Sequence, residues 1–211
     1  RLLKGEHIGL VGANGEGKST FMNMLGCLDV PTSGHYFLNG KDVSSLSDDE
    51  LSEIRNQEIG FIFQGFNLIQ NLTALENVEL PLIYRNVPAA ERRRLSEESL
   101  KRVGLEKRMD HKPTEMSGGQ QQRVAIARAL AAAPPLILAD EPTGNLDSKS
   151  SREIMDILRK LHTEGRTVIL ITHDDKIAQS AKRIIRIMDG KIESDSGMAD
   201  PKSMEEENGE K

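Results

Sequence analysis

A glycine-rich segment near the beginning of the chain has the residue types and spacing that bind phosphate. In GANGEGKST, the residues Gly12, Gly17, Lys18 and Ser19 fit the pattern G-x-x-x-x-G-K-[ST], and the apolar run HIGLV comes just before it. Such a loop presents backbone N–H groups and a helix N-terminus to phosphate oxygens, while the lysine and hydroxyl attract the β- and γ-phosphates and Mg²⁺. The sequence thus predicts a triphosphate-binding loop. Its expected contact residues are Gly12, Ala13, Asn14, Gly15, Glu16, Gly17, Lys18, Ser19 and Thr20.

Two adjacent carboxylates follow another apolar run. LILADEP places Asp140 at the end of an expected strand, with Glu141 and Pro142 directly after it. An acidic residue in this place binds Mg²⁺, directly or through water, in phosphate-loop enzymes, and we assign that role to Asp140. Strand side chains alternate between faces, but Pro142 indicates that the chain is already turning, so both carboxylates can face one site. Glu141 is then placed to activate water as a general base.

Gln64 and His173 end the apolar runs IGFIFQ and VILITH. A solvated side chain is the simpler interpretation of each, but the carboxyl ends of parallel strands are where open α/β sheets bind ligands. We therefore place both in the catalytic set with Glu141 and Lys18, and we add Gln64 to Ser19 and Asp140 as metal ligands. We expect His173 either to bond the γ-phosphate or to orient Glu141. The four other histidines lack metal-ligand spacing, so no metal other than nucleotide-borne Mg²⁺ is expected.

Ser117, Gly118 and Gly119 lead into three glutamines and the apolar stretch VAIARAL. This pattern predicts a helix that begins at bare glycine backbone, with its dipole and N–H groups available to an anion. A glycine-rich cap on a core helix explains the apolar stretch, but it leaves the two glycines and the glutamines unexplained.

The elements that must position these residues are read from apolar periodicity. The four apolar runs already named indicate buried strands of a largely parallel sheet, and SREIMDILRKLHTEG repeats Ile154, Ile157, Leu158 and Leu161 at helical spacing before Gly165. Asn39-Gly40 and Asp189-Gly190 predict hairpins, and therefore an antiparallel portion. The expected fold is α/β, a phosphate-loop nucleoside triphosphatase with a mostly parallel sheet.

The chain is expected to form one domain over residues 1–193. A helical subdomain is inserted at about residues 70–132, where PAAERRRLSEESLKRVGL places Pro88 near the start of a helix and Gly104 near its end. Residues 194–211 contain almost no apolar side chains and are expected to be a disordered tail.

Composition narrows the classes of function. With 37% hydrophobic and 29% charged residues among 211, the chain is expected to fold, and its apolar runs are far shorter than the roughly 20 residues of a membrane span. The single cysteine, Cys27, and the lack of a secretion signal indicate a cytoplasmic protein. A net charge of −5 and 3% aromatic residues argue against a nucleic-acid partner.

The order of these motifs resembles that of ATP-binding cassette (ABC) ATPases. MSGGQ resembles the family's LSGGQ signature, and the resemblance also covers the phosphate loop, Gln64 as the Q-loop, LILADE, GNLD at Gly144 to Asp147, and His173 as the switch histidine. It implies ATP and Mg²⁺ as cofactors and hydrolysis of ATP to ADP and phosphate. It also implies a head-to-tail dimer, expected to be a homodimer, in which each ATP lies between one phosphate loop and the other copy's signature. The implied signature and D-loop contacts to nucleotide are Ser117, Gly118, Gly119, Gln120 and Asp147.

Within that family, LGCLDVPTSG, FIFQGFNLI, LTALENVELPLIY and DEPTGNLDS resemble the branch of macrolide exporters and lipoprotein-releasing ATPases. The resemblance implies a transmembrane permease partner, a location on the inner face of the cell membrane, and ATP-driven closure that powers export, lipoprotein release or mechanical transmission. Gln64, Phe66, Asn67 and Leu68 are the positions implied to receive a permease helix.

The sequence departs from the family pattern in two respects, which define the alternative interpretations of its fold and function. The family usually carries an earlier strand pair with an adenine-stacking aromatic residue, and no aromatic residue precedes Phe21, so N-terminal strands are expected to be missing. The loop GANGEGKST also resembles soluble two-cassette ABC proteins that act on ribosomes, and this is the main alternative function. Chromosome-maintenance ABC ATPases would need long coiled coils, and a phosphate-loop kinase would lack the signature.

Overall fold

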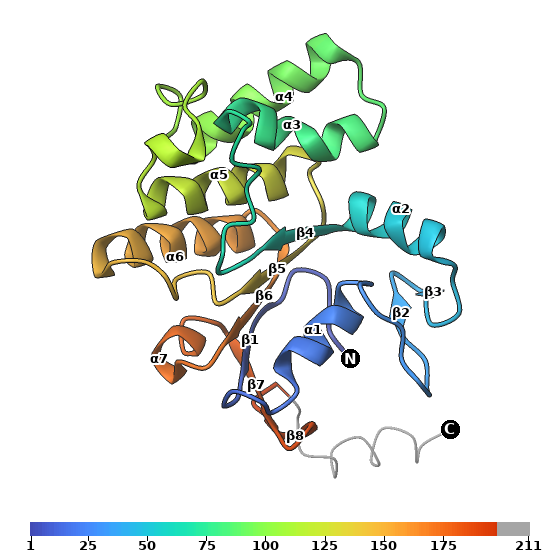
Figure 1. The fold of residues 1–211 in the computed structure, drawn as a ribbon. Coiled ribbons are helices and arrows are strands. Elements are labelled where there is room, and N and C mark those ends of the chain that lie inside the picture. The colour runs from blue at the N-terminus through green and yellow to red at the C-terminus, as the bar shows by residue number, and fades with distance from the viewer. Residues whose placement is uncertain (198–211) are drawn as a thin grey trace.

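Apolar runs form a six-stranded sheet in the computed structural model, which describes residues 1–197 (Figure 1). The strand order is β4-β5-β6-β1-β7-β8. The strands are β1 (His7–Val11), β4 (Ile59–Ile62), β5 (Leu136–Asp140), β6 (Thr167–Thr172), β7 (Arg183–Met188) and β8 (Lys191–Asp195). Neighbouring strands are parallel except β7 and β8, which are antiparallel. The prediction of an α/β fold with a mostly parallel sheet is therefore confirmed.

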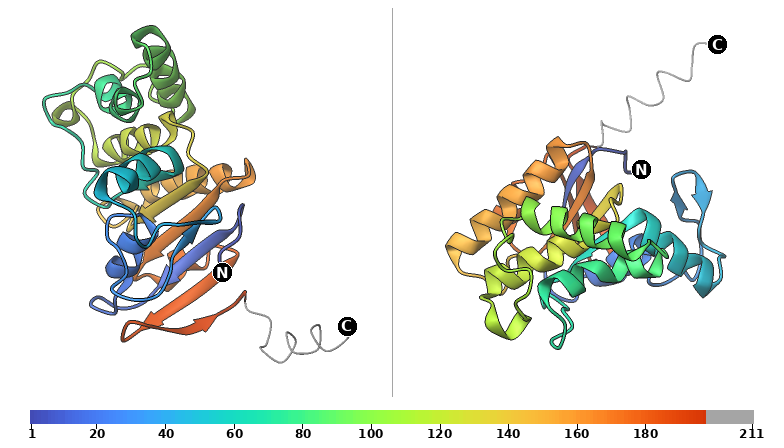
Figure 2. Two further views of the ribbon diagram at one scale, coloured as in Figure 1. Left: turned by 90° about the vertical axis from the view of Figure 1, so that its right-hand side faces the viewer. Right: turned by 90° about the horizontal axis from the view of Figure 1, so that it is seen from above.

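Helices cover both faces of this sheet (Figures 1 and 2). They are α1 (Lys18–Leu25), α2 (Asp48–Glu58), α3 (Ala74–Tyr84), α4 (Ala89–Arg102), the 3₁₀ helix η1 (Pro113–Glu115), α5 (Gly118–Ala131), α6 (Ser148–Thr163) and α7 (Asp175–Ala178). Side chains alternate along β5, so that Ile137 and Ala139 pack with α3 to α6, while Leu136 and Leu138 pack with α1 and α2. The strands β1, β5 and β6 are thus buried on both faces, as their continuous apolar sequences require.

The two predicted hairpins are present. Asn39-Gly40 joins β2 (Phe37–Leu38) to β3 (Lys41–Asp42) in a separate two-stranded sheet, and Asp189-Gly190 joins β7 to β8. All four turn residues have positive φ, which asparagine, aspartate and glycine adopt most readily and which two-residue hairpins require. The second hairpin places a turn beside the phosphate loop.

Segment 70–132, the expected helical insertion, contains α3, α4, η1 and α5. These helices lie at one end of the molecule, and the β7–β8 hairpin lies at the other (Figure 2). Capping boxes start α3 at Thr73 with Glu76 and α5 at Ser117 with Gln120, so the sequence sets where these helices begin. The helix α3 continues through Pro81.

The C-terminal boundary differs slightly from the expected one. Ser194 and Asp195 belong to β8, where they pair with Arg186 and Ile185. The Asp195 carboxylate also accepts hydrogen bonds from the Arg183 guanidinium at 2.6 and 2.8 Å, which holds this end of the strand in the sheet. Most of the expected tail, residues 198–211, lies outside the described residues.

Candidate active site

The phosphate loop joins β1 to α1, as its sequence predicts. Gly17 is the N-cap of α1 with φ of 92°, and Lys18 begins the helix. The Lys18 side chain is only 7% exposed, and its Nζ donates to the carbonyl oxygens of Gly12 at 2.6 Å and Ala13 at 2.7 Å. Since an ammonium group has three donors, one remains for a phosphate oxygen. Ser19 and Thr20 follow in the first turn of α1 and are exposed, so both hydroxyls are accessible to a ligand.

The β7–β8 hairpin supports this loop from one side. A Cβ on Gly12 would collide with the carbonyl oxygen of Ile187, so only glycine permits this close approach. The Glu16 carboxylate accepts a hydrogen bond from the backbone N–H of Asp189, and the Glu16 carbonyl accepts one from Gly190 at 3.1 Å. The contact of Glu16 with nucleotide stays a prediction, whereas its contacts to the hairpin are present in the structure.

Asp140 and Glu141 lie together at the carboxyl end of β5. Burial is the main cause that raises the pKa of the Asp140 carboxyl, the charge of Glu141 raises it further, and Lys18 acts in the opposite direction. These three charged groups are therefore near neighbours. Glu141 has φ of 43°, a left-handed conformation that turns the chain immediately after the strand. This turn explains how consecutive carboxylates serve one site.

Three polar groups at and just after the end of β6 contact the Glu141 carboxylate. The Thr172 hydroxyl donates to Oε2 at 3.1 Å, and the backbone N–H of His173 donates to Oε1 at 2.7 Å. His173 Nδ1 lies 2.6 Å from the same Oε1. Of the two roles expected for His173, the structure therefore shows the contact that orients Glu141. Thr172 was not identified from the sequence, although its place between a buried strand and His173 was a signal.

Gln64 lies two residues after β4 and is exposed. Its Nε2 donates to Asn145 Oδ1 at 3.3 Å, and Asn145 Nδ2 donates to the Gln64 carbonyl at 3.1 Å. Gln64 thus lies against GNLD rather than in a hydrogen bond to Asp140, Ser19 or Lys18. Its assignments as a metal ligand and catalytic residue remain predictions.

The signature segment begins α5. The Ser117 hydroxyl accepts from the Gln120 N–H at 3.3 Å, and the Gln120 side chain accepts from the Ser117 N–H at 2.9 Å. A Cβ on Gly119 would lie 2.6 Å from Ser150 Oγ on α6, which explains the second glycine by packing. Ser117 is exposed and Gly118 is half-buried. The helix start is therefore accessible and already formed.

Asp147 has a structural role at the start of α6. As N-cap, its Oδ1 accepts from the N–H groups of Lys149 at 2.9 Å and Ser150 at 3.0 Å, and its Oδ2 accepts from Ser150 Oγ at 2.6 Å. The bonds from Ser150 are the main reason that its pKa is lowered. The predicted contact of Asp147 with nucleotide would have to be made alongside these three bonds.

The phosphate loop and the signature of one chain lie in different surroundings. The loop is packed against the β7–β8 hairpin, whereas the signature is packed against α6 and the segment after β4, which contributes Phe66. Among the described residues, no hydrogen bond joins residues 12–20 to residues 117–120. Figure 1 shows α1 and α5 on opposite sides of the sheet.

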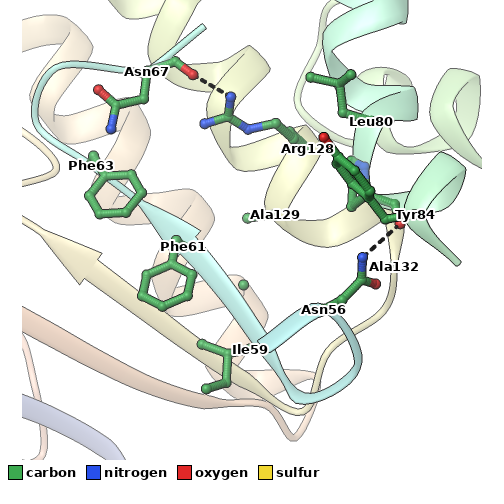
Figure 3. Close-up of a pocket in the computed structure, with 12 residues that line it drawn as sticks. Asn56, Ile59, Phe61, Phe63, Asn67, Leu80, Tyr84, Arg128, Ala129 and Ala132 are labelled. Atoms are coloured by element: carbon green, nitrogen blue, oxygen red, sulfur yellow. Dashed lines mark hydrogen bonds between the residues drawn. The ribbon is translucent and has the colours of Figure 1, made fainter. Parts of the chain in front are cut away.

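A groove opens between α2, β4, α3 and α5. A cavity of about 360 Å³ has Phe61 and Phe63 on one wall and Tyr84 and Arg128 on the other (Figure 3). A larger cavity of about 1140 Å³ shares both phenylalanines and Tyr84 with it. We call these two cavities together the groove. The rings of Phe61 and Phe63 stack with centroids 5.5 Å apart, so the groove has a rigid aromatic wall.

The four positions that the resemblance implied for a permease contact differ in where they lie relative to this groove, and their contact with a permease stays a prediction. Asn67 lines the groove, but Leu68 is 8% exposed and packs in the core, and Phe66 lies under Gly118. Phe61 and Phe63 were missed, although their spacing of two in a strand places both on one face. Tyr84 and Arg128 come from distant segments and only the tertiary structure brings them there.

A mostly parallel sheet with a phosphate loop after β1 and paired carboxylates after β5 defines a phosphate-loop nucleoside triphosphatase. The family model described as ABC transporter matches residues 1–144. The chain belongs to the ABC transporter family, and it is an ATP-binding, ATP-hydrolysing cassette of that family. The resemblance seen in the motifs is therefore confirmed.

Individual relatives agree with this assignment. An uncharacterized ABC transporter ATP-binding protein of Thermotoga maritima is 53% identical over 192 residues, which are 91% of this chain and 82% of that protein. The macrolide export ATP-binding/permease protein MacB of Vibrio parahaemolyticus is 54% identical over 193 residues, 92% of this chain. The chain spans only 30% of the length of that MacB protein.

Solved structures with the same fold include the ATP-binding cassette MJ0796 in a dimeric post-hydrolysis state with ADP and Pi. The TM-score is 0.85 at 50% identity, covering 92% of this chain and 86% of that one. The protein cbiO1 from Clostridium perfringens, part of an ABC transporter complex, has a TM-score of 0.83 at 29% identity, covering 98% and 82%. Among the described residues, no helix is both long and apolar enough to span a membrane.

Proposed function

We propose that two copies of this chain close head to tail around two molecules of ATP, and that closure drives a transmembrane permease. The observation that carries this proposal is the accessible, preformed start of α5, which makes no hydrogen bond to the phosphate loop of its own chain. A second copy in reverse orientation would bring its signature to that loop. The dimeric structure of the related cassette MJ0796 supports the arrangement.

Within each site, Glu141 accepts the proton of the water that attacks the γ-phosphorus. Thr172 and His173 hold its carboxylate in place, which fixes the direction of proton transfer. Lys18, the start of α1 and the second copy's signature N–H groups stabilise the negative charge of the transition state. The water oxygen bonds to the γ-phosphorus, the bond from that phosphorus to the oxygen that bridges it to the β-phosphate breaks, and ADP and inorganic phosphate are the products.

Mg²⁺ fits the donor set at this site. Burial and the charge of Glu141 raise the pKa of the Asp140 carboxyl, and a nearby cation would favour its charged form. The exposed Ser19 hydroxyl supplies a second oxygen ligand, and Gln64 is the third residue that we assign to it. When bound, Mg²⁺ neutralises charge on the β- and γ-phosphates.

The substitution Glu141→Gln tests this proposal. It keeps the shape of the side chain but removes the proton acceptor, so ATP should still bind while turnover falls at least about a hundredfold, the size of a general-base contribution. Light scattering should then show an ATP-dependent dimer that persists. Turnover at the wild-type rate would rule out the general base, and a monomer with ATP and Mg²⁺ would rule out the closure.

We propose the groove as the permease-docking surface, which places the cassette peripherally on the inner face of the membrane. Its supports are the apolar wall of Phe61 and Phe63 and the 77% exposed Tyr84 beside Arg128. The relatives named MacB combine an ATP-binding part and a permease in one protein, of which this chain covers only the first part. Export, lipoprotein release and mechanical transmission are all compatible with this arrangement.

Tyr84→Glu tests the docking surface. A carboxylate in the groove should abolish copurification with the membrane partner in detergent, while ATP binding by the isolated cassette stays unchanged. Phe37→Glu is the matched control, because Phe37 is also an exposed aromatic residue, 61% exposed, but lies on β2 outside the groove. Retention of the permease by Tyr84→Glu, or its equal loss in both variants, would contradict the assignment.

A further inference from the structure

Gln122 is a buried amide that the proposed mechanism does not use. It lies in the second turn of α5, two residues beyond the signature contact Gln120, and is 0% exposed. Buried amides need hydrogen-bond partners, so a fully buried glutamine inside an amphipathic helix requires an explanation. The three glutamines were also the feature of this stretch that core packing left unexplained.

The side-chain amide of Gln122 connects three segments that are far apart in the sequence. Its Nε2 donates to the Pro142 carbonyl at 2.8 Å and to the Phe63 carbonyl at 3.3 Å. Pro142 follows Glu141, and Phe63 precedes Gln64. Both partners are acceptors, so the reverse orientation of the amide would place oxygen against oxygen, and the contacts fix the orientation observed.

The contact to Pro142 supports a strained residue. Glu141 has φ of 43°, which is unfavourable for a residue with a Cβ and persists only where the surroundings hold it. Its N–H donates to the Ile171 carbonyl at 2.9 Å, and its carbonyl accepts from Gly144 at 3.0 Å. Gln122 adds a third restraint, at the next peptide group along the chain.

The two carbonyl partners differ in their dependence on Gln122. The Phe63 carbonyl also accepts from the Phe66 N–H at 3.2 Å, so it keeps a partner without Gln122. Among the described residues, Gln122 is the only hydrogen-bond donor to the Pro142 carbonyl, and Pro142 itself is buried. Loss of the amide would therefore act mainly on the segment that carries Glu141.

We propose that Gln122 is a positioning residue that couples the signature helix to Glu141. It resists displacement of Glu141 relative to α5, so the helix that meets the second copy's nucleotide is linked directly to the general base of its own site. This inference rests on the role of Glu141 proposed above. It adds Gln122, and the connection that Gln122 makes between α5 and the segment after β5, to the residues that the signature and the carboxylate motif contain.

Gln122→Met tests the coupling, since methionine has a similar length but no donor. Turnover should fall at least about tenfold with the dissociation constant for ATP within about twofold of wild type, because the phosphate loop is untouched. In the Glu141→Gln background, the same change should alter the residual turnover less than twofold, because the base it positions is already lost. Wild-type turnover in folded Gln122→Met, or an equal decrease in both backgrounds, would overturn the proposal.

Asn77→Leu is the control for a purely structural effect. Asn77 is likewise a 0% exposed amide, but it bonds only within the segment 69–73, to Ile69, Leu72 and Thr73. Its loss should lower the melting temperature while the turnover of folded protein stays unchanged. Glu141→Gln alone separates the two hypotheses: wild-type turnover in it refutes the general base, whereas a crippled Glu141→Gln beside an active Gln122→Met refutes only the coupling.

If Gln122→Met does not fold, the variant Gln122→Glu tests the same coupling. A protonated carboxyl group can donate one hydrogen bond to the Pro142 carbonyl, and an ionised one cannot. Turnover relative to wild type should therefore decrease as pH rises through the pKa of the new carboxyl group. A ratio independent of pH would contradict the role of the donated hydrogen bond.

Discussion

At the level of single residues, the proposed site depends on the Glu141 carboxylate and the groups that hold it. In its proposed role as a base, Glu141 has a carboxylate fixed by Thr172 and His173, and its strained backbone turns the chain immediately after β5. Strain of this kind costs on the order of 1–2 kcal/mol, which the surrounding hydrogen bonds must offset. Catalytic geometry is here maintained at some expense of stability.

We also expect Asp140 to support activity while it lowers the stability of the fold. Asp140→Asn removes a carboxyl group whose pKa is raised by burial and by Glu141, so the nucleotide-free cassette should melt at a higher temperature. A neutral amide is a poor Mg²⁺ ligand, so turnover should fall at least about tenfold. Thermal unfolding with and without ATP and Mg²⁺, together with an ATPase assay, checks both effects; unaltered Mg²⁺-dependent turnover would remove Asp140 from the site.

His7 predicts how stability depends on pH. Burial, and then the charges of His162, Arg159 and Lys182, lower its pKa to about 4 from an ordinary value of 6.5. Because the unfolded chain takes up a proton first, the stability due to neutral His7 is complete above pH 6.5 and is lost as pH falls toward 4, up to about 3 kcal/mol. Urea unfolding of wild type and His7→Leu across this range should show a shallower decline in the variant; parallel curves would contradict the prediction.

At the scale of elements, helix starts and one hairpin turn organise the ligand site. The capping box of α5 uses the Ser117 hydroxyl only as an acceptor, so its O–H can still donate to a phosphate. The phosphate loop packs against the hairpin of β7 and β8, which follow it by more than 160 residues in the chain. Glu16 is the side chain that joins these two elements.

The contact from Glu16 to the hairpin can be separated from its charge. Glu16→Gln keeps an acceptor for the Asp189 N–H but removes the negative charge, whereas Glu16→Ala removes both. We expect Glu16→Ala to bind ATP about 3- to 10-fold more weakly than Glu16→Gln, as the loss of one hydrogen bond of about 1 kcal/mol implies. Titration with a fluorescent ATP analogue compares the two neutral variants, and equal affinities would show that the hairpin contact does not support the loop.

For the whole molecule, the proposed function requires a second copy because one chain keeps its phosphate loop and signature apart. Figure 2 shows the helices α3 to α5 and the β7–β8 hairpin at opposite ends of the molecule, with the other strands of the sheet between them. A cassette arranged in this way can bind ATP alone, but it can complete the site only by association. The dimer is therefore part of the proposed catalytic unit.

Complementation between two defective variants tests the head-to-tail arrangement. Ser117→Arg should bind ATP normally as a monomer but hydrolyse little, because arginine obstructs the other copy's nucleotide. Lys18→Ala should bind ATP poorly. When the two variants are mixed, a dimer of one copy of each has one intact site, formed by the phosphate loop of the Ser117→Arg copy and the signature of the Lys18→Ala copy. Hydrolysis should therefore reappear. A mixture as inactive as its components would exclude the head-to-tail arrangement.

Much of the fold and site could be predicted from the sequence. The four apolar runs, the Asn-Gly and Asp-Gly turns and the triphosphate loop express local rules of periodicity, turn conformation and backbone geometry, so local sequence was sufficient for them. The contacts of Glu141 with Thr172, of Glu16 with Asp189 and of Gln122 with Pro142 were not predictable in this way. They join residues between 20 and 173 positions apart in the chain.

The amino-acid sequence specifies which chemical groups are present and that each follows a strand or begins a helix, because those signals are carried within a few residues. Which side chains meet depends on the packing of the whole chain. The order of strands brings β6 beside β5, so Thr172 and His173 reach Glu141, and the packing of α5 buries Gln122 against two loops. Strand order and helix packing are set by the burial of apolar surface across the entire chain, which no single segment specifies.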